Sequence, residues 1–405
     1  MTAAAPHRPI RNLLSSADYR RVWFVGGVIW TMRWLEVLAM SIYTFDLTGS
    51  AFAVALMTAL RSLPMLLVSA YAGAIAERFD RRRLLIAAMI MLAISNAVLG
   101  LLALAGWIEL WHIAIGAMLN GLYWAADMSV RRTVMAEIAG IDRLGAAMTV
   151  DSATNNLTRF LGPIAGGLIY QFLGLHGSFL VVGLFYALAA IAALPISHRS
   201  ELSGAPPMRM LDSILEGLRH ALADRAIAGT LALTFVLNLL VFPYNALIPV
   251  IGRDEMGLEP FPIGVLMAAE GVGAVIGAMF IAPLIRPAGY MRLYVVGSST
   301  IAISVLLFAL SHSFESALIV LTLSGLGVAG FASMQSTLVY SLAPPGLRPR
   351  IMGALSTCIG AMPLGILYIG FLAAQLGTRG ALLALAIQGV VAVALVLIIW
   401  PELRR

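Results

Sequence analysis

The chain has 405 residues, of which 60% are hydrophobic and only 11% are charged, and its mean hydropathy is +0.93. A soluble globular domain has about 45–50% apolar and roughly 25% charged residues, so this composition excludes a soluble enzyme, a disordered chain and a fibrous protein. One cysteine, Cys358, excludes a disulfide framework and a cysteine-based metal cluster. At roughly 20 apolar residues for each crossing of a bilayer, the length predicts an all-α membrane protein with about a dozen transmembrane helices.

Apolar runs follow one another along the whole sequence and are too long and continuous for the strands of a membrane β-barrel. We expect twelve helices, near residues 22–45, 51–75, 83–107, 111–128, 146–172, 178–196, 228–250, 262–285, 291–311, 315–341, 351–376 and 380–400. The first run follows a polar stretch, and no cleavage site of small residues comes after the run, so we expect a retained helix rather than a signal peptide.

The longest polar stretch separates the sixth run from the seventh. It begins with Ser-Gly-Ala-Pro-Pro and then places leucine, isoleucine and methionine at helical spacing near 210–222, which predicts a helix at the membrane interface. The sequence therefore divides into an N-terminal six-helix half (1–196), a cytoplasmic linker with an amphipathic helix (197–227) and a C-terminal six-helix half (228–405). Such a layout is typical of transporters built from two parallel halves.

The charges of the polar segments predict the orientation. All 26 basic residues are arginines, against 20 acidic residues. With the expected helices, 21 arginines fall on the side of the two termini, two on the other side and three within helices. Because cytoplasmic loops carry the excess of basic residues, both termini are expected in the cytoplasm. This placement accounts for the net charge of +6 without any nucleic acid partner.

Four ionisable residues lie near the middle of the expected helices: Arg33 and Glu36 in the first, Arg61 in the second and Arg159 in the fifth. An arginine at the centre of a bilayer costs about 2.5–3.5 kcal/mol even on a mild insertion scale, and it keeps its proton. These side chains must therefore face a watery cavity, a carboxylate or a ligand. Arg33 and Glu36 are three residues apart, so they share a helix face on which they could pair directly.

Further polar residues continue this pattern. Asp151, Asn155 and Arg159 recur at intervals of four along one face of the fifth helix, and Glu270 lies within the eighth. We interpret Glu36, Glu270 and Asp151 as candidate proton-coupling carboxyls, because burial and neighbouring charges tune the proton affinity of such groups. The arginines Arg33, Arg61 and Arg159 would attract an anionic part of a substrate. The alternatives are structural: Arg61 pairs with a carboxylate, Arg159 ties the fifth helix to the first, and Glu270 is a neutral packing residue.

Two sequence motifs resemble those of a known family. The loop after the second run contains Gly73, Glu77, Arg78 and Arg81 at the spacing of motif A of the major facilitator superfamily. The fifth run resembles motif C of its antiporter branches through Gly162, Pro163, Gly166 and Gly167. The likeness covers essentially the whole chain and is greatest to the bacterial efflux subgroup of the enterobactin exporter and the macrolide-efflux permeases. Motif A here has glutamate where the family usually has aspartate.

The resemblance implies roles for several of these residues. In the family, the charges of motif A pair with the fourth helix and with the start of the eleventh. This implies a conformational latch that closes the cytoplasmic side and consists of Gly73, Glu77, Arg78, Arg81, Asp127 and Arg350. The alternative is that these charges serve only to set the topology.

The resemblance also implies which helices line the substrate cavity: the first, fourth, seventh and tenth. Aromatic and polar residues of those helices would then lie near the substrate, namely Trp30, Trp34, Tyr123, Trp124, Tyr244, Asn245, Met334 and Gln335. Pro243 and Pro249 of the seventh helix predict an interruption there, because proline removes a helical hydrogen bond.

The sequence thus predicts a secondary transporter rather than an enzyme. No histidines cluster to bind a metal and no phosphate-binding loop is present, so we expect no cofactor and a proton gradient as the energy source. We expect a monomer in the bacterial cytoplasmic membrane that exports a small amphipathic organic compound, with an anion or chelator favoured and a drug-like compound as a further candidate. The alternatives are uptake or symport of an organic anion, and a lipid-handling or sensor protein on the same fold.

Overall fold

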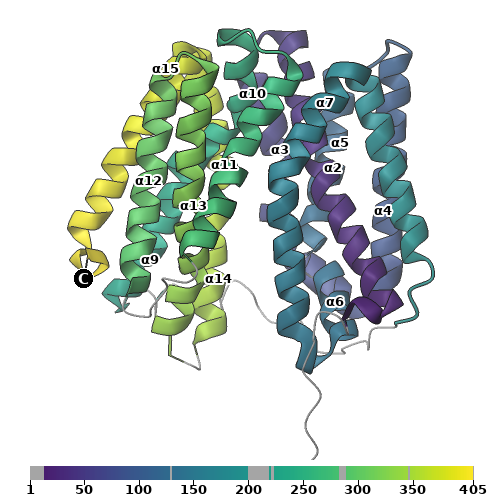
Figure 1. The fold of residues 1–405 in the computed structure, drawn as a ribbon, viewed down its shortest axis with the longest axis horizontal. Coiled ribbons are helices and arrows are strands. Elements are labelled where there is room, and N and C mark those ends of the chain that lie inside the picture. Colours follow the sequence, from purple (N-terminus) through teal and green to yellow (C-terminus); the bar gives the residue numbers. More distant parts are fainter. Residues whose placement is uncertain are drawn as a thin grey trace, which may run out of the picture.

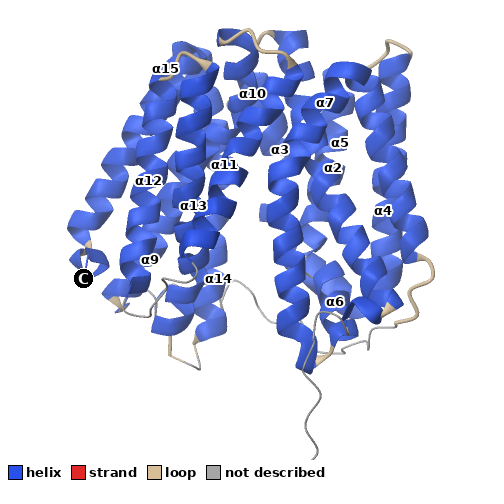
Figure 2. Cartoon of the chain, viewed as in Figure 1, coloured by secondary structure: helices blue, strands red, loops and turns tan. Residues whose placement is uncertain are grey.

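The computed structural model describes residues 13–127, 130–198, 219, 223–281, 289–344 and 347–404, without the side chains of residues 66–78, 141 and 349. Every regular element in these ranges is a helix (Figures 1 and 2). The amphipathic helix expected near 210–222 lies outside the described residues, apart from Arg219.

The helices form two bundles that stand side by side (Figure 1). The first bundle contains α2 (Ala17–Thr48), α3 (Ala51–Arg78), α4 (Arg81–Leu104), α5 (Leu110–Asp127), α6 (Arg131–Ala139), the short η1 (Ile141–Arg143) and α7 (Leu144–Ala193). The second contains α9 (Arg225–Val236), η2 (Leu237–Val241), η3 (Phe242–Ala246), α10 (Ile248–Val250), η4 (Ile251–Glu255), α11 (Pro260–Ile281), α12 (Tyr290–Leu310), α13 (Phe314–Leu342), α14 (Arg348–Ile359), α15 (Met362–Ile399) and η7 (Pro401–Arg404).

Eight helical segments of the described chain are long and apolar enough to cross a membrane. Two of them, Leu144–Ala193 and Arg350–Ile399, have 50 residues each and turn back at a glycine in the left-handed region, Gly174 (φ 61°) and Gly377 (φ 74°). A residue with a Cβ atom is strained in that conformation, whereas glycine adopts it readily. Each segment therefore supplies two crossings, and α3 and α5 complete the twelve-helix major facilitator architecture expected from the sequence.

Local sequence explains where several helices begin and end. The Ser16 hydroxyl accepts a hydrogen bond from the Tyr19 amide at the start of α2, and Asp80 accepts one from the Arg82 amide at the start of α4. Such caps satisfy backbone donors that have no helical partner. The seventh crossing is irregular where Pro243 and Pro249 lie: between α9 and the end of η4, π- and 3₁₀-helical turns leave only the short α10 as α-helix.

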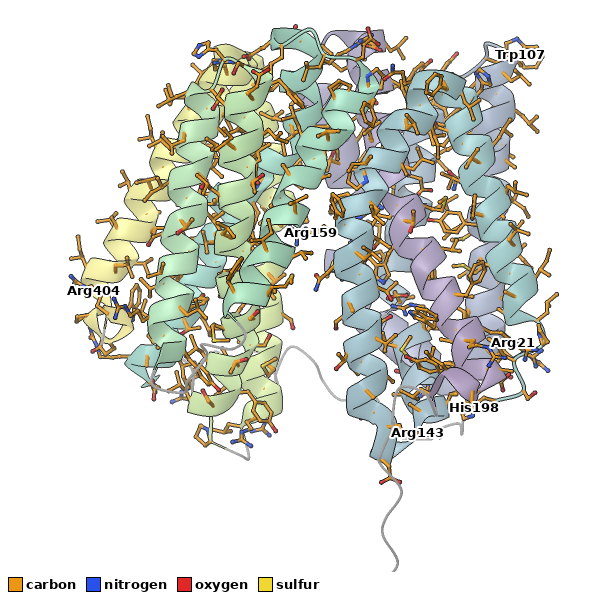
Figure 3. All side chains as sticks on the ribbon, viewed as in Figure 1. Arg21, Trp107, Arg143, Arg159, His198 and Arg404 are labelled. Carbon is orange, nitrogen blue, oxygen red and sulfur yellow. The ribbon has the colours of Figure 1, made fainter. Side chains whose placement is uncertain are left out.

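We name the two ends of the molecule by what lies there. The α6 end carries α6, α14 and η7, and the opposite, Trp107 end carries the loop after α4 (Figures 1 and 3). Each bundle has its own apolar core, but the core of the second bundle also takes in Leu38, Ile42 and Val54 of α2 and α3. The bundles diverge toward the α6 end in Figure 1.

Contacts between the bundles depend on small residues. α7 packs against α11, and α3 packs against α15. A Cβ on Gly264 of α11 would lie 2.3 Å from the Pro163 carbonyl oxygen, and a Cβ on Gly167 of α7 would lie 2.5 Å from that of Pro260. The two backbones can approach this closely only because these positions have no side chain.

Replacing Gly264 by alanine should therefore separate α7 from α11 and lower stability by about 1–3 kcal/mol, as overpacking of a tight contact does. Thermal unfolding of the purified protein in detergent measures this effect. Gly353→Ala is the matched control, because a Cβ there meets no atom within 4 Å. Equal melting temperatures for the two variants would contradict the tight contact.

Candidate functional site

A buried carboxylate lies at the centre of the first bundle. Glu36 of α2 is 7% exposed, and its Oε1 accepts a hydrogen bond of 2.9 Å from the Asn96 amide of α4. Its Oε2 accepts hydrogen bonds from the Asn120 amide of α5 and, at 3.3 Å, from the Tyr186 hydroxyl of α7. Its hydrogen-bond donors in the described structure are thus neutral groups from three helices.

The nearest cation reaches this carboxylate indirectly. Arg61 of α3 donates a hydrogen bond of 2.8 Å to the Asn120 side-chain oxygen, and Asn120 in turn donates to Glu36. The hydrogen bond to Asn120 therefore accounts for the position of Arg61. Neither a direct ion pair with a carboxylate nor contact with a ligand is required to explain it. The direct pair of Arg33 with Glu36 that the helix spacing allowed is absent from the structure, so that expectation was wrong.

Arg33 instead faces aromatic rings. Its guanidinium stacks on Trp124 of α5 and lies 5.7 and 5.5 Å from the ring centroids of Trp30 and Trp34. The Nε of Arg33 and the indole nitrogens of Trp30 and Trp34 are buried and have no hydrogen-bond acceptor in the described structure. A buried donor without a partner costs about 1–3 kcal/mol, and more when it is charged. The guanidinium is attracted to the ring faces, but this attraction satisfies none of these donors.

A cavity of about 50 Å³ lies beside this cluster. Its wall comes from α2, α5 and α7 and consists of Ile29, Trp30, Arg33, Asn120, Tyr123, Trp124, Asp127 and Tyr186. Asn120 also lines a smaller cavity of about 20 Å³ that contains Glu36 and Arg61. The two cavities therefore meet at one amide side chain, with Arg33 on one side and Glu36 on the other.

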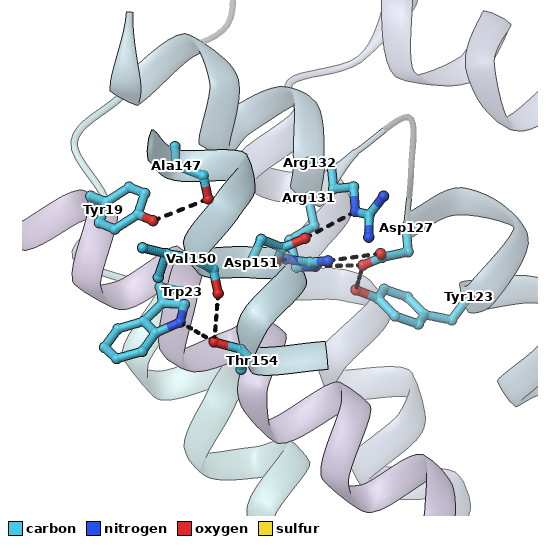
Figure 4. Close-up of polar contacts among 10 residues, drawn as sticks. All are labelled: Tyr19, Trp23, Tyr123, Asp127, Arg131, Arg132, Ala147, Val150, Asp151 and Thr154. Atoms are coloured by element: carbon cyan, nitrogen blue, oxygen red, sulfur yellow. Dashed lines mark hydrogen bonds and ion pairs between the residues drawn. The ribbon is translucent and has the colours of Figure 1, made fainter. Parts of the chain in front are cut away.

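A network of arginines and aspartates lies toward the α6 end of the same bundle (Figure 4). Arg131, which has no exposed surface, contacts Asp127 through Nε at 2.6 Å and through Nη2 at 3.0 Å, and contacts Asp151 at 2.6 Å. Arg132 forms a 3.0 Å ion pair with Asp151, and the Tyr123 hydroxyl donates to Asp127. Every donor nitrogen of the Arg131 guanidinium thus meets an aspartate, and a buried ion pair needs such partnering to offset its desolvation.

This network changes the interpretation of two predicted residues. Asp127 was expected to meet motif A, but its partners are Arg131 and Tyr123, while Arg81 pairs with Glu137 at 2.5 Å. The surroundings of Gly73 and the side chains of Glu77 and Arg78 lie outside the described part of the structure, and Arg350 lies at the start of α14. The latch therefore stays a prediction, and the contact between Arg81 and Asp127 is not part of this conformation.

A second set of predicted residues joins the two bundles. Arg159 of α7 forms an ion pair of 2.5 Å with Glu270 of α11, whose other oxygen accepts a hydrogen bond of 2.8 Å from the Tyr244 hydroxyl. Figure 3 shows Arg159 on the side of α7 that faces the second bundle. The alternative that Arg159 ties the fifth crossing to the first was wrong, because its partner comes from the eighth.

The remaining predicted cavity residues have mixed surroundings. Tyr244 is fully buried against Glu270, and Gln335 is buried and donates to the Thr234 hydroxyl. Asn155 and Asn245 are half-buried. Their contact with a substrate stays a prediction.

The motif C residues hold α7 close to two neighbours. A Cβ on Gly162 would lie 2.7 Å from the Trp34 ring, and one on Gly166 would lie 3.1 Å from the Leu35 Cα. Gly167 and Pro163 instead approach the backbone of α11 in the other bundle. These four residues thus seat the fifth crossing between α2 and α11.

Several residues of the site were missed by reading the sequence for charged groups within helices. Asn96 and Asn120 lie in the middle of apolar helices, where a polar amide is itself an informative signal. Arg131 is one of the 21 arginines that the orientation argument assigned to polar segments on the side of the two termini. The ion pair of Asp46 with Arg253, at 2.9 Å, joins α2 to η4 across the bundles at the Trp107 end, and no spacing in the sequence indicates it.

Comparison with known proteins identifies the family to which this chain belongs. A family model described as a transmembrane secretion effector matches residues 6–404. The multidrug efflux pump Tap of Mycolicibacterium fortuitum is 28% identical over 389 residues, covering 92% of each chain. The staphyloferrin A transporter of Staphylococcus aureus is 22% identical and the macrolide efflux protein A of Streptococcus pyogenes is 19% identical, covering 85% and 84% of this chain and 87% and 86% of those relatives.

Solved structures show the same fold. A POT family transporter in complex with 5-aminolevulinic acid has a TM-score of 0.76 at 12% identity, covering 96% of each chain. A bacterial homologue of the lysosomal transporter Spinster, in an inward-facing and unoccupied conformation, has a TM-score of 0.72 at 12% identity, covering 95% of this chain and 98% of that one.

The protein is thus a multi-pass membrane transporter of the major facilitator superfamily and not an enzyme. Within that superfamily the chain belongs to the transmembrane secretion effector family, whose members act in efflux.

We expect the buried ion pairs around Arg131 to stabilise the fold. Arg131→Met should leave Asp127 and Asp151 without their shared cation and destabilise the protein by about 3–5 kcal/mol, the cost of breaking a buried ion pair. The measurement is the melting temperature and the yield of monodisperse protein. Arg83→Gln is the control, because the Arg83 side chain is 85% exposed. A melting temperature for Arg131→Met equal to that of the control would show that the network does not stabilise the fold.

Proposed function

We propose that this transporter is a proton-coupled antiporter that exports small amphipathic organic compounds from the bacterial cytoplasm by alternating access. The observation that carries the proposal is the environment of Glu36. Among the buried carboxylates of the described residues, Asp127, Asp151 and Glu270 each contact an arginine directly, whereas Glu36 is held by two amides and a phenol. A carboxylate without a direct cation takes up a proton more readily than one that is ion-paired, because its protonation breaks no ion pair.

The other two candidate proton sites then have different tasks. Asp151 is held by two arginines and acts as a fixed charge in the network around Arg131. Glu270 pairs with Arg159 across the bundles, so their separation during transport would expose both charges or require a proton on Glu270. We therefore assign the coupling proton to Glu36 and a role in joining the bundles to Glu270.

The orientation follows from the arginines. Placing the α6 end and both termini in the cytoplasm puts the excess of basic residues inside. The contacts at the Trp107 end, between Asp46 and Arg253 and between Gly167 and α11, would then close the periplasmic side. Compounds would bind from the cytoplasm in this conformation.

Export is favoured over the alternative of lipid handling by the position of a further hollow, separate from the two cavities that Asn120 lines. This hollow, of about 520 Å³, is lined by α2 and α7 residues that include Trp23, Val28, Thr31 and Thr158. At 100° for each residue, Val28 and Thr31 lie on the side of α2 opposite to Arg33. A lipid-handling protein should have its lateral apolar opening beside the polar cavity, and this hollow does not adjoin it.

Glu36→Gln should abolish the dependence of export on a pH gradient while leaving the fold intact, because glutamine cannot carry the coupling proton but keeps the shape of glutamate and one of its two acceptor oxygens. In proteoliposomes, transport of a drug exported by the wild type should fall at least about tenfold when a pH gradient drives it. Glu315→Gln is the matched control, since Glu315 is exposed. Gradient-driven export that persists in Glu36→Gln would remove Glu36 from coupling.

Alternating access predicts that the Trp107 end must open. In a variant with Cys358→Ala, cysteines at positions 46 and 253 joined by a short bifunctional thiol reagent should block transport, because that link spans the two bundles. The same link between positions 255 and 379 should leave transport unchanged, since Arg379 and Glu255 pair within the second bundle. Full transport with positions 46 and 253 linked would contradict the opening of this end.

A further inference from the structure

The cavity beside Arg33 has an unusual set of polar atoms. Two residues of its wall carry buried hydrogen-bond donors that have no acceptor among the described residues: the Nε of Arg33 and the indole nitrogen of Trp30. Both belong to α2, and the rings of Trp30 and Trp124 meet edge to face at 5.6 Å. The wall therefore offers donors and ring faces.

The formal charge around this cavity is positive. Arg33 forms no ion pair within the described structure, and Arg61 compensates Glu36 through Asn120. Asp127 also lines the cavity, but its oxygens accept from Arg131 and Tyr123. The positive charge of Arg33 would repel a cationic ligand. The carboxylate oxygens of Asp127 already accept hydrogen bonds from other residues and are not free to bind such a ligand.

We propose that this cavity binds the oxyanion head group, a carboxylate or a group of similar size, of an aromatic organic acid. The donors of Arg33 and Trp30 bond its oxygens, since a guanidinium with a carboxylate forms strong charge-assisted hydrogen bonds. The aromatic part of the acid stacks on the indole rings. This inference rests on the proposed export function and assigns its substrate class.

The size of the cavity restricts what enters it. A volume of about 50 Å³ accepts a carboxylate but not a whole drug-sized molecule. The rest of the compound must lie outside the cavity. Trp34 marks the direction, because it packs both against Gly162 of α7 and against the core of the second bundle. The acid would thus extend from Arg33 past Trp34 toward the junction of the bundles.

Calorimetric titration of the detergent-solubilised protein tests this with matched probes: 1-naphthoate, the neutral 1-naphthamide and the cationic 1-naphthylmethylamine. We expect 1-naphthoate to bind at least about tenfold more tightly than either of the others. Arg33→Gln should reduce that preference to near unity, Arg33→Lys should retain part of it, and Arg83→Gln should retain all of it. Inorganic phosphate distinguishes a bare oxyanion site from one that also needs the ring, and it should bind more weakly than 1-naphthoate.

Three results would overturn the proposal. They are equal affinity of the wild type for the acid and the amide, undiminished preference in Arg33→Gln, and phosphate binding as tightly as 1-naphthoate. The first and third need no variant, so poor folding of Arg33→Gln leaves the proposal testable. The titration uses no proton gradient. A negative result for the binding of the acid is therefore independent of the result of the Glu36→Gln transport experiment. If the protein binds the acid selectively but its transport does not depend on a pH gradient, the proposal of proton coupling is wrong and the proposed substrate class stands.

Discussion

A guanidinium group inside a membrane keeps its charge, and much of this structure follows from where each buried arginine finds compensation. Arg131 finds two aspartates and thereby joins α5, α6 and α7. A Cβ on Gly26 of α2 would lie 2.6 Å from the Nη1 of Arg131. Because Gly26 has no side chain, α2 can pack directly against this guanidinium. Arg159 finds Glu270 and links the bundles, and Arg61 finds Glu36 through an amide. Arg33 is left with ring faces alone.

The fold could be predicted from the sequence almost completely because a bilayer permits few solutions. Backbone groups in hydrocarbon must be bonded within the helix, so long apolar runs become helices of predictable number. The sharp returns at Gly174 and Gly377 and the irregular turns from η2 to η4 refine those helices without changing their order.

The residue types of the candidate site could also be predicted, but their partners could not. Charged residues in the middle of helices stand out in the sequence, as Arg33, Glu36, Arg159 and Glu270 did. Which of them meet depends on the rotation and depth of helices that lie far apart in the chain. Arg159 and Glu270 are 111 residues apart, and the spacing of Arg33 and Glu36 on one helix suggested a pair that the packing does not form. Asn120 was missed although other amides, Asn155 and Asn245, were named, because nothing in the sequence shows which amide meets Glu36.

The tight returns at Gly174 and Gly377 have a mechanical consequence. Each connects a helix at the bundle junction, the first part of α7 or of α15, directly to a helix with an apolar outer face. With so little chain at the turn, a junction helix that tilts carries its outer neighbour through the surrounding lipid. The elasticity and lateral pressure of the bilayer therefore become part of the energy of the transport cycle, so lipid composition can set its speed without touching the substrate.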